Sequence, residues 1–334
     1  MLRKVLPLAL LLLVSCLGNQ EKKGTLLNQG NPLFRDAYTA DPAPMVAQDG
    51  RLYVFCGHDE QYDDMPGFEG KHGYNITEWL CYSTADMQSW TAHGTVLKPS
   101  DFDWADAEAW ASHCVEANGK YYLYVTTQSS EPDCKAIGVA VADRPEGPYK
   151  DAIGKALILD GMTPNGPLGQ WNDIAPSVMV DSDGTPWLCW GSGTCFLVRL
   201  KKNMVELDGQ ILTLSLDNYE ESPWLYKRNG RYYLVYASMG PGRETLSYAM
   251  AADIQGPWEY KGQVSGMVRD CFSTHPGVIE FNGKSYLFYH NATLSLHGRG
   301  PSMGRRSVCV DELQYNQDGT IRPVEQTLGV VSKL

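Results

Sequence analysis

Two acidic residues, Asp41 and Glu221, stand at the same distance from two similar turns. Each lies eight residues before an Asp-Gly or Asn-Gly pair, at 49–50 and 229–230. Such a pair between apolar runs predicts a tight β-hairpin, because both turn positions can adopt positive φ. If the hairpins are equivalent, the two carboxylates lie on equivalent strands and can meet. Two carboxyl groups in different environments can serve as general base and general acid.

The same turn phrase recurs along the whole chain: an Asn/Asp-Gly pair, two further residues, and then aromatic or apolar residues. The five copies span 49–55, 118–124, 183–189, 229–235 and 282–288. Five similar hairpins at a coarse period predict an all-β, single-domain, five-bladed β-propeller. The net charge of −11, without a basic cluster, argues against nucleic acid as a partner.

The residues eight positions before the five turns are predicted to form a ring at one end of the central channel. They are Asp41, Trp110, Ala175, Glu221 and Thr274, with His275 one residue further on. Taken alone, Asp41 could be a turn acid and Glu221, beside Glu220, part of a solvated face. The shared offset favours a site. Because neighbouring residues of a strand point to opposite faces, only Glu221 of the two glutamates is expected to enter the channel.

The N-terminus has the pattern of an export signal. Arg3 and Lys4 precede an apolar run over 5–14, which is followed by Ser15 and Cys16. The residues around Cys16 resemble a bacterial lipobox, with an ordinary signal peptide as the alternative. We therefore interpret 1–24 as a lipoprotein signal peptide and tether, and 25–334 as the propeller. The protein is expected to be exported, facing the periplasm or the cell surface, and to touch a membrane only through a lipid on Cys16.

Eight further cysteines follow, without a spacing that indicates a disulfide framework or a zinc site. We expect them to be mostly free and buried. The last strand, predicted at 307–313, is expected to pair with the strand after residue 25 and so close the ring.

A set of short motifs in this order resembles glycoside hydrolase family 43, which comprises five-bladed arabinofuranosidases, xylosidases and arabinanases. The resemblance covers about 31–330 and is carried by Asn31-Pro32-Leu33, Ala40-Asp41-Pro42, Trp110-Ala111, Ile174-Ala175-Pro176-Ser177, Glu221-Ser222-Pro223-Trp224, His275-Pro276-Gly277 and Asp318-Gly319-Thr320-Ile321. It implies that Asp41 is the general base and Glu221 the general acid. It also implies that His275 helps to hold a hydrated cation, often calcium, although no cofactor is required. Trp110 is the best candidate to stack on a sugar.

One position departs from the family pattern. The acid that usually orients and tunes the general acid stands in an Ile-Asp-Pro-Ser phrase, and this chain has Ala175 there. Asp173 stands two residues earlier, and residues i and i+2 of a strand share a face. Asp173 is therefore predicted to take this role beside Glu221, with a surface loop acid as the alternative.

Four further residues are candidates for binding sugar hydroxyls. His58 and Asp59 follow the first hairpin, and Arg305 and Arg306 precede the last strand. Each could equally be an ordinary loop residue. The loop over 59–77 is long enough to wall off one end of the channel.

The leading interpretation is an inverting glycosidase that removes arabinose or xylose from plant oligo- or polysaccharide as a monomer. The chain ends at Leu334, without room for the additional β-sandwich that many β-xylosidases of the family carry, which favours an exo-acting α-L-arabinofuranosidase. β-Xylosidase and arabinanase activities remain alternatives. A sugar-binding propeller that lost catalysis at Ala175 is the alternative of another class, and a protein-interaction scaffold is a third.

Overall fold

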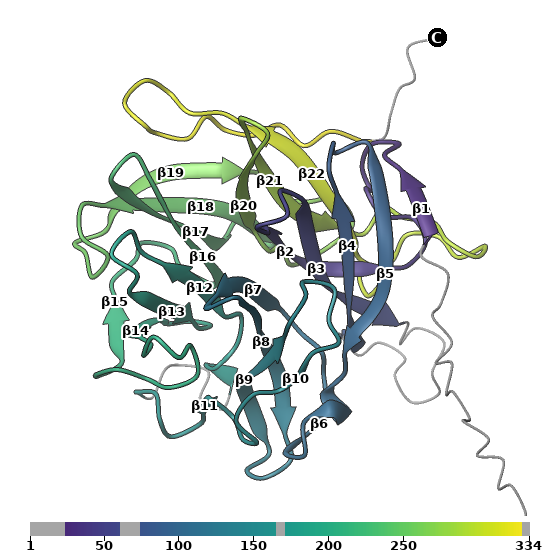
Figure 1. Ribbon diagram of the computed structural model, residues 1–334. Helices are drawn as coiled ribbons and strands as arrows, with labels where there is room; N and C mark the ends of the chain where they lie inside the picture. The colour runs from purple at the N-terminus through teal and green to yellow at the C-terminus, as the bar shows by residue number, and fades with distance from the viewer. Residues whose placement is uncertain (1–23, 61–73, 165–170, 329–334) are drawn as a thin grey trace, which may run out of the picture.

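The computed structural model describes residues 24–60, 74–164 and 171–328 of the chain. It is an all-β ring of five antiparallel sheets, coloured from purple to yellow in chain order (Figure 1). The predicted five-bladed β-propeller is confirmed. Cys16 and the predicted signal peptide lie outside the described residues, apart from Gly24 at the end of the tether.

The first two blades contain the N-terminal half of the strands. Blade 1 is ordered β1-β5-β4-β3-β2, and its strands are β1 (Gly24–Leu27), β2 (Thr39–Val46), β3 (Leu52–Glu60), β4 (Asn75–Thr84) and β5 (Ser89–Leu97). A 3₁₀ turn, η1 (Pro99–Asp101), leads to blade 2. Blade 2 is built around β8 and β9, and its strands are β6 (Ala105–Ala107), β7 (Ser112–Ala117), β8 (Lys120–Ser129), β9 (Cys134–Ala142), β10 (Lys150–Asp151) and β11 (Ile158–Leu159).

The remaining blades follow simple meanders from the channel outward. Blade 3 contains β12 (Ser177–Val180), β13 (Pro186–Trp190), β14 (Cys195–Arg199) and β15 (Leu212–Leu214). Blade 4 contains β16 (Glu221–Arg228), β17 (Arg231–Met239), β18 (Glu244–Ala251) and β19 (Glu259–Ser265). Blade 5 contains β20 (Gly277–Phe281), β21 (Lys284–Asn291) and β22 (Ser307–Leu313).

The predicted turns join the innermost strand of each blade to its neighbour. In three hairpins both turn residues adopt positive φ, as at Asn118 (55°) and Gly119 (69°) between β7 and β8. This is the geometry that the Asn-Gly pairs predicted. The innermost strands β2, β7, β12, β16 and β20 contact one another in sequence around the channel, so the residues at their starts converge.

The ring closes differently from the sequence-based expectation. β22 pairs with β21, and β1 pairs with β5 at the outer edge of blade 1, so β22 and β1 are not partners. The segment after β1 makes the junction instead: Leu33 N–H donates to Val308 O (2.7 Å) and Thr39 N–H to Arg306 O (2.8 Å). Gly277 lies so close to blade 1 that a Cβ there would stand 2.4 Å from Pro44 Cδ.

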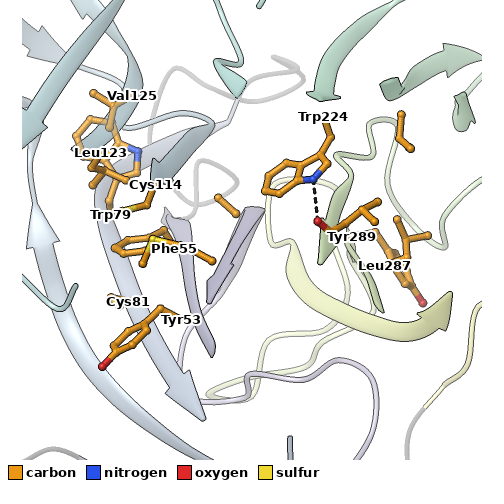
Figure 2. Packing of buried hydrophobic residues seen from close by; sticks show 14 of the residues in the cluster. Tyr53, Phe55, Trp79, Cys81, Cys114, Leu123, Val125, Trp224, Leu287 and Tyr289 are labelled. Carbon is orange, nitrogen blue, oxygen red and sulfur yellow. Dashed lines mark hydrogen bonds between the residues drawn. The ribbon is translucent and has the colours of Figure 1, made fainter. Parts of the chain in front are cut away.

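A continuous apolar core fills the space between the inner blades. In Figure 2, Trp79, Phe55 and Leu123 of this core lie together at the left of the view, and Trp224 lies at the right. The Trp224 indole donates to Val278 O (2.9 Å), which satisfies its one polar atom and links blade 4 to blade 5. The eight cysteines of the described residues are free and buried, as expected. No helix in the described parts of the chain is long and apolar enough to cross a membrane.

Candidate active site

The innermost strands surround a cavity of about 440 Å³ where they begin. Its walls come from all five blades, because each innermost strand contributes residues from its beginning or from the segment just before it. Of the residues singled out in the sequence, six line this cavity: Asp41, Trp110, Ala175, Glu221, His275 and Arg306.

Asp41 is held in one position and in its ionised form. Its side chain is 9% exposed, Oδ1 accepts a hydrogen bond from Arg306 Nη1 (3.1 Å), and its backbone N–H donates to His290 Nδ1 (3.2 Å). Burial alone would raise the pKa of this carboxyl, but the charge of Arg306, together with smaller contributions from His290 and His275, lowers it below its ordinary value. A carboxyl group whose pKa is lowered stays ionised to lower pH and can accept a proton from water.

Asp59 supports the site from behind. It is fully buried, and its two oxygens accept hydrogen bonds from Arg306 Nε (2.9 Å) and Nη2 (3.0 Å). The guanidinium also stacks on the Tyr74 ring, with its Cζ 3.8 Å from the centroid. Asp59 thus fixes Arg306, and only Arg306 and Tyr74 of these three face the cavity.

Glu221 has the opposite electrostatic character. Burial, followed by the negative charges of Asp41 and Glu220, raises the pKa of Glu221 to about 7. A carboxyl group with this pKa is still largely protonated in mildly acidic solution, whereas Asp41 is already ionised. One cavity therefore contains a potential general base and a potential general acid whose pKa values are driven apart.

The starts of the innermost strands explain how these side chains turn into the cavity. Four of them contain a residue followed by proline, and these residues are Asp41, Ala175, Ser222 and His275. Asp41 (φ 53°), Ala175 (56°) and Ser222 (59°) have left-handed backbones, and bulges interrupt β2 and β16 at these points. The structural equivalent of Asp41 in blade 4 is therefore Ser222, and Glu221 stands one residue earlier.

This geometry also changes the expectation for Glu220. Glu220 and Glu221 both line the cavity. Strict alternation does not apply, because Glu220 precedes β16 and the bulge follows at Ser222. The sequence rule that only one of the two glutamates can enter the channel is therefore corrected.

Among the described residues, the Asp173 carboxyl group is hydrogen-bonded to Trp190 and Thr163 and not to Glu221. Asp173 is fully buried, its Oδ1 accepts from Trp190 Nε1 (2.8 Å), and its Oδ2 accepts from Thr163 Oγ1 (3.1 Å). Burial raises its pKa to about 6, and Asp173 is absent from the cavity walls as far as the structure describes them. The prediction assumed that 173–175 form an extended strand. These residues instead precede β12, and the backbone of Ala175 is left-handed. The i, i+2 rule therefore does not place Asp173 and Ala175 on the same face.

Aromatic side chains form one wall of the cavity. Trp110 and Trp171 line it with ring centroids 5.4 Å apart, and Trp171 is 44% exposed. Lys135 lies behind them, with its Nζ 4.0 Å from the Trp110 centroid and paired with Glu108. The Lys135 ammonium group thus contacts both indole rings and the Glu108 carboxylate. The exposed ring of Trp171 can stack on the face of a sugar.

The other candidates have different surroundings. His58 Nδ1 lies 3.0 Å from Glu78 Oε1, and Arg305 Nε donates to Gly300 O (3.1 Å). Neither residue is among the cavity-lining residues of the described chain. Most of the loop predicted to wall off the channel, 61–73, lies outside the described residues, although Tyr74 and Ile76 at its end line the cavity.

His275 is the one predicted metal residue. It is 5% exposed, and neither ring nitrogen has a hydrogen-bond partner among the described residues. No group of three or more His, Cys, Asp or Glu in the described parts of the chain is arranged to hold a metal ion. The described side chains therefore do not form a metal site built from several protein ligands. The calcium site remains a prediction.

Sequence reasoning missed several residues of the site. Glu108, Trp171, Glu244 and Phe272 line the cavity, and His290 lies directly beneath Asp41. Glu244 is the first residue of β18, and its Oε2 accepts from Thr274 N–H (2.8 Å). None of these residues stands at a fixed distance from a hairpin turn, so the repeat carried no signal for them.

Comparison with known proteins gives this geometry a family. The sequence profile of glycosyl hydrolases family 43 matches residues 30–321. The chain belongs to this family. A xylosidase/arabinosidase of Bacteroides ovatus is 30% identical, over 86% of this chain and 95% of that protein. An arabinoxylan arabinofuranohydrolase of Paenibacillus polymyxa is 28% identical over 91% of this chain, which spans only 53% of that longer protein.

Solved family 43 structures share the fold. A β-xylosidase/α-arabinofuranosidase from a compost microbial metagenome, solved with xylotriose in a calcium-free form, superposes with a TM-score of 0.78. It is 27% identical, and the match covers 91% of this chain and all of that one. An α-L-arabinofuranosidase of Clostridium thermocellum is 32% identical, with a TM-score of 0.70 over 90% of this chain and 98% of that one. Family 43 consists of glycoside hydrolases, so this chain is grouped with enzymes that cleave glycosidic bonds.

Proposed function

We propose that this family 43 protein is an inverting glycosidase that removes arabinose or xylose units from plant polysaccharide, acting as an exo-α-L-arabinofuranosidase. The observation that carries the proposal is the pair of carboxyl groups in one cavity. Arg306 keeps Asp41 ionised, and burial with neighbouring negative charge keeps Glu221 protonated up to about pH 7.

In this mechanism Asp41 accepts a proton from a water molecule that attacks the anomeric carbon. Glu221 gives its proton to the departing glycosidic oxygen on the opposite side of the sugar ring. Inversion requires room for the water, so we expect the two carboxyl groups to be roughly 6.5–9.5 Å apart. Positive charge develops on the sugar in the transition state, and the acidic cavity favours it.

Several observations support the choice of substrate. The named relatives include a xylosidase/arabinosidase and an arabinoxylan arabinofuranohydrolase. Solved neighbours were captured with xylotriose and xylose. The cavity of about 440 Å³ is of the size that takes a small ligand, which suits the removal of single sugars.

Hydrolysis of a panel of nitrophenyl glycosides tests the proposal. We expect the highest kcat/KM on the α-L-arabinofuranoside, and proton NMR of the first product should show the inverted anomer. A preference for the β-D-xyloside, or internal cleavage of linear arabinan, would reassign the enzyme within the family. Sugar binding without hydrolysis would identify a sugar-binding propeller, with Ala175 as the first position to examine.

We also propose that the chain is an exported lipoprotein anchored through Cys16. The support is the apolar run over 5–14, which stands two residues before this cysteine. Incorporation of labelled fatty acid into the protein, and its loss in the Cys16→Ser variant, is the expected result. Equal labelling of both proteins, or labelling of neither, would contradict the proposal.

A further inference from the structure

A closed set of contacts surrounds the proposed general base. Arg306 Nη1 donates to Asp41, the guanidinium stacks on Tyr74, and Tyr74 Oη lies 3.0 Å from Ser273 Oγ. His290 completes the loop, because its ring lies between Ser273 and Asp41. Asp41, Tyr74, Ser273 and Arg306 line the cavity, whereas His290 is fully buried beneath them.

The two ring nitrogens of His290 make different hydrogen bonds. Nδ1 lies 3.2 Å from the Asp41 backbone nitrogen and 3.4 Å from Asp41 Oδ1, whereas Nε2 lies 3.0 Å from the Ser273 carbonyl oxygen and 3.5 Å from Ser273 Oγ. A backbone N–H can only donate, and a carbonyl oxygen can only accept. Nδ1 therefore carries the lone pair and Nε2 carries the proton, so His290 is a neutral imidazole with one defined tautomer.

This neutral form agrees with the surroundings of the ring. Complete burial, followed by the positive charge of Arg306, lowers the pKa of His290 to about 3. A protonated ring would carry a proton on Nδ1 and could no longer accept the Asp41 N–H.

The bond to Asp41 falls at a strained point of the chain. Asp41 has φ of 53° inside the bulge of β2, a region that residues other than glycine seldom adopt. The bulge removes Asp41 from the β2–β3 pairing, whose register passes from Ala40–Gly57 to Ala43–Phe55. His290 Nδ1 supplies an acceptor for the backbone N–H that this bulge leaves without a ladder partner.

We propose that His290 is a positioning residue for the general base: its neutral ring holds the backbone of Asp41 in the left-handed conformation that directs the carboxylate into the cavity. The role of Asp41 as base rests on the function proposed above. His290 acts through Asp41 and touches no substrate. Its contribution is geometric, because a displacement of about 1 Å at a reacting group can lower a rate about 10²-fold.

Two substitutions separate the two hydrogen bonds. In His290→Asn the side-chain oxygen can take the place of Nδ1 and accept the Asp41 N–H. In His290→Gln the longer side chain places its amide nearer to Nε2, which retains the bond to Ser273 O and loses the acceptor. We expect His290→Gln to lower kcat about 10- to 100-fold with KM within about twofold, and His290→Asn to stay within about threefold of wild type.

His113→Gln is a matched control. His113 is also buried, burial lowers its pKa to about 3, and it packs on Trp224 with ring centroids 4.4 Å apart. We expect this variant to lose thermal stability without the selective loss of kcat. An equal fall in kcat in His290→Gln and His290→Asn would contradict a positioning role. An increase in KM with kcat unchanged would contradict it as well.

The tautomer of the wild-type protein provides a test that requires neither a stable variant nor activity. Nitrogen-15 NMR of labelled histidine should show His290 protonated on Nε2 alone from about pH 5 to pH 8. A proton on Nδ1 in this range would overturn the inference, because Asp41 N–H would then have no acceptor. If the wild-type enzyme hydrolyses no glycoside but the tautomer is as expected, the proposed function fails and the contact with Asp41 stands.

Discussion

Substitution of Glu220 by Gln tests how the protein keeps Glu221 protonated. The Glu221 pKa of about 7 compares with an ordinary value of 4.5. At pH 7 about half of the molecules then carry the proton, whereas an ordinary glutamate would carry it in about 0.3%. The environment thus favours the protonated form by about 3 kcal/mol, or roughly 150-fold in the population that can act as an acid.

Glu220 contributes a minor part of this effect. Burial and the charge of Asp41 both raise the pKa more than Glu220 does. Removing the Glu220 charge should therefore lower the pKa of Glu221 by less than about one pH unit. The alkaline limb of the pH profile should move to lower pH, because the acid loses its proton earlier. We expect kcat/KM at pH 8 to fall about 3- to 10-fold, with little change at pH 5.

The assay is kcat/KM on an aryl glycoside from pH 4 to pH 9, which reports the ionisations of the free enzyme. Glu280→Gln is the control, because Glu280 is exposed on β20 and does not line the cavity. An alkaline limb that stays in place or moves to higher pH in Glu220→Gln would refute the electrostatic explanation. If Glu220 lay outside the channel, as strand alternation predicts, the substitution would have little effect, so the experiment also tests the position of Glu220.

Three further predictions concern the base, a buried acid and the ring junction. Asp41→Asn should lower kcat/KM by about 10² to 10⁴ while the circular dichroism spectrum remains that of wild type; near-normal turnover would remove Asp41 from the mechanism. Asp173→Asn should weaken the bonds to Trp190 and Thr163 and destabilise the fold by about 1–3 kcal/mol in urea unfolding, without moving the alkaline limb. Gly277→Ala would place a Cβ 2.4 Å from Pro44 Cδ and should cost about 1–3 kcal/mol or more, so unchanged stability would show that the blades can separate there.

The fold could be predicted because it repeats. An Asn-Gly turn indicates a hairpin through its own backbone preferences, and five copies indicate how many blades there are. The same repeat led to Asp41 and Glu221, since residues near the start of each innermost strand converge on the channel. The register was less certain: Ser222, and not Glu221, is the structural equivalent of Asp41.

The remainder of the site could not be predicted, because it depends on departures from regular strands. The i, i+2 rule failed for Asp173 since the chain turns left-handed at Ala175. Glu244 and His290 belong to the third strand of blade 4 and the second strand of blade 5, where no repeat marks a position. Their importance follows from tertiary contacts, which a single sequence does not display.

The bond between Arg306 and Asp41 joins residues 265 positions apart in the chain. At translation rates of about 5–20 residues per second, on the order of 10–50 s separate the synthesis of the two. A nascent chain therefore exposes its base long before the counter-ion emerges from the ribosome. A product that ends between Glu221 and Arg306 contains both carboxyl groups but lacks the arginine that pairs with Asp41 in the folded site. The cavity is therefore incomplete until the residues before the final strand have been added, because the contact between Asp41 and Arg306 can form only then.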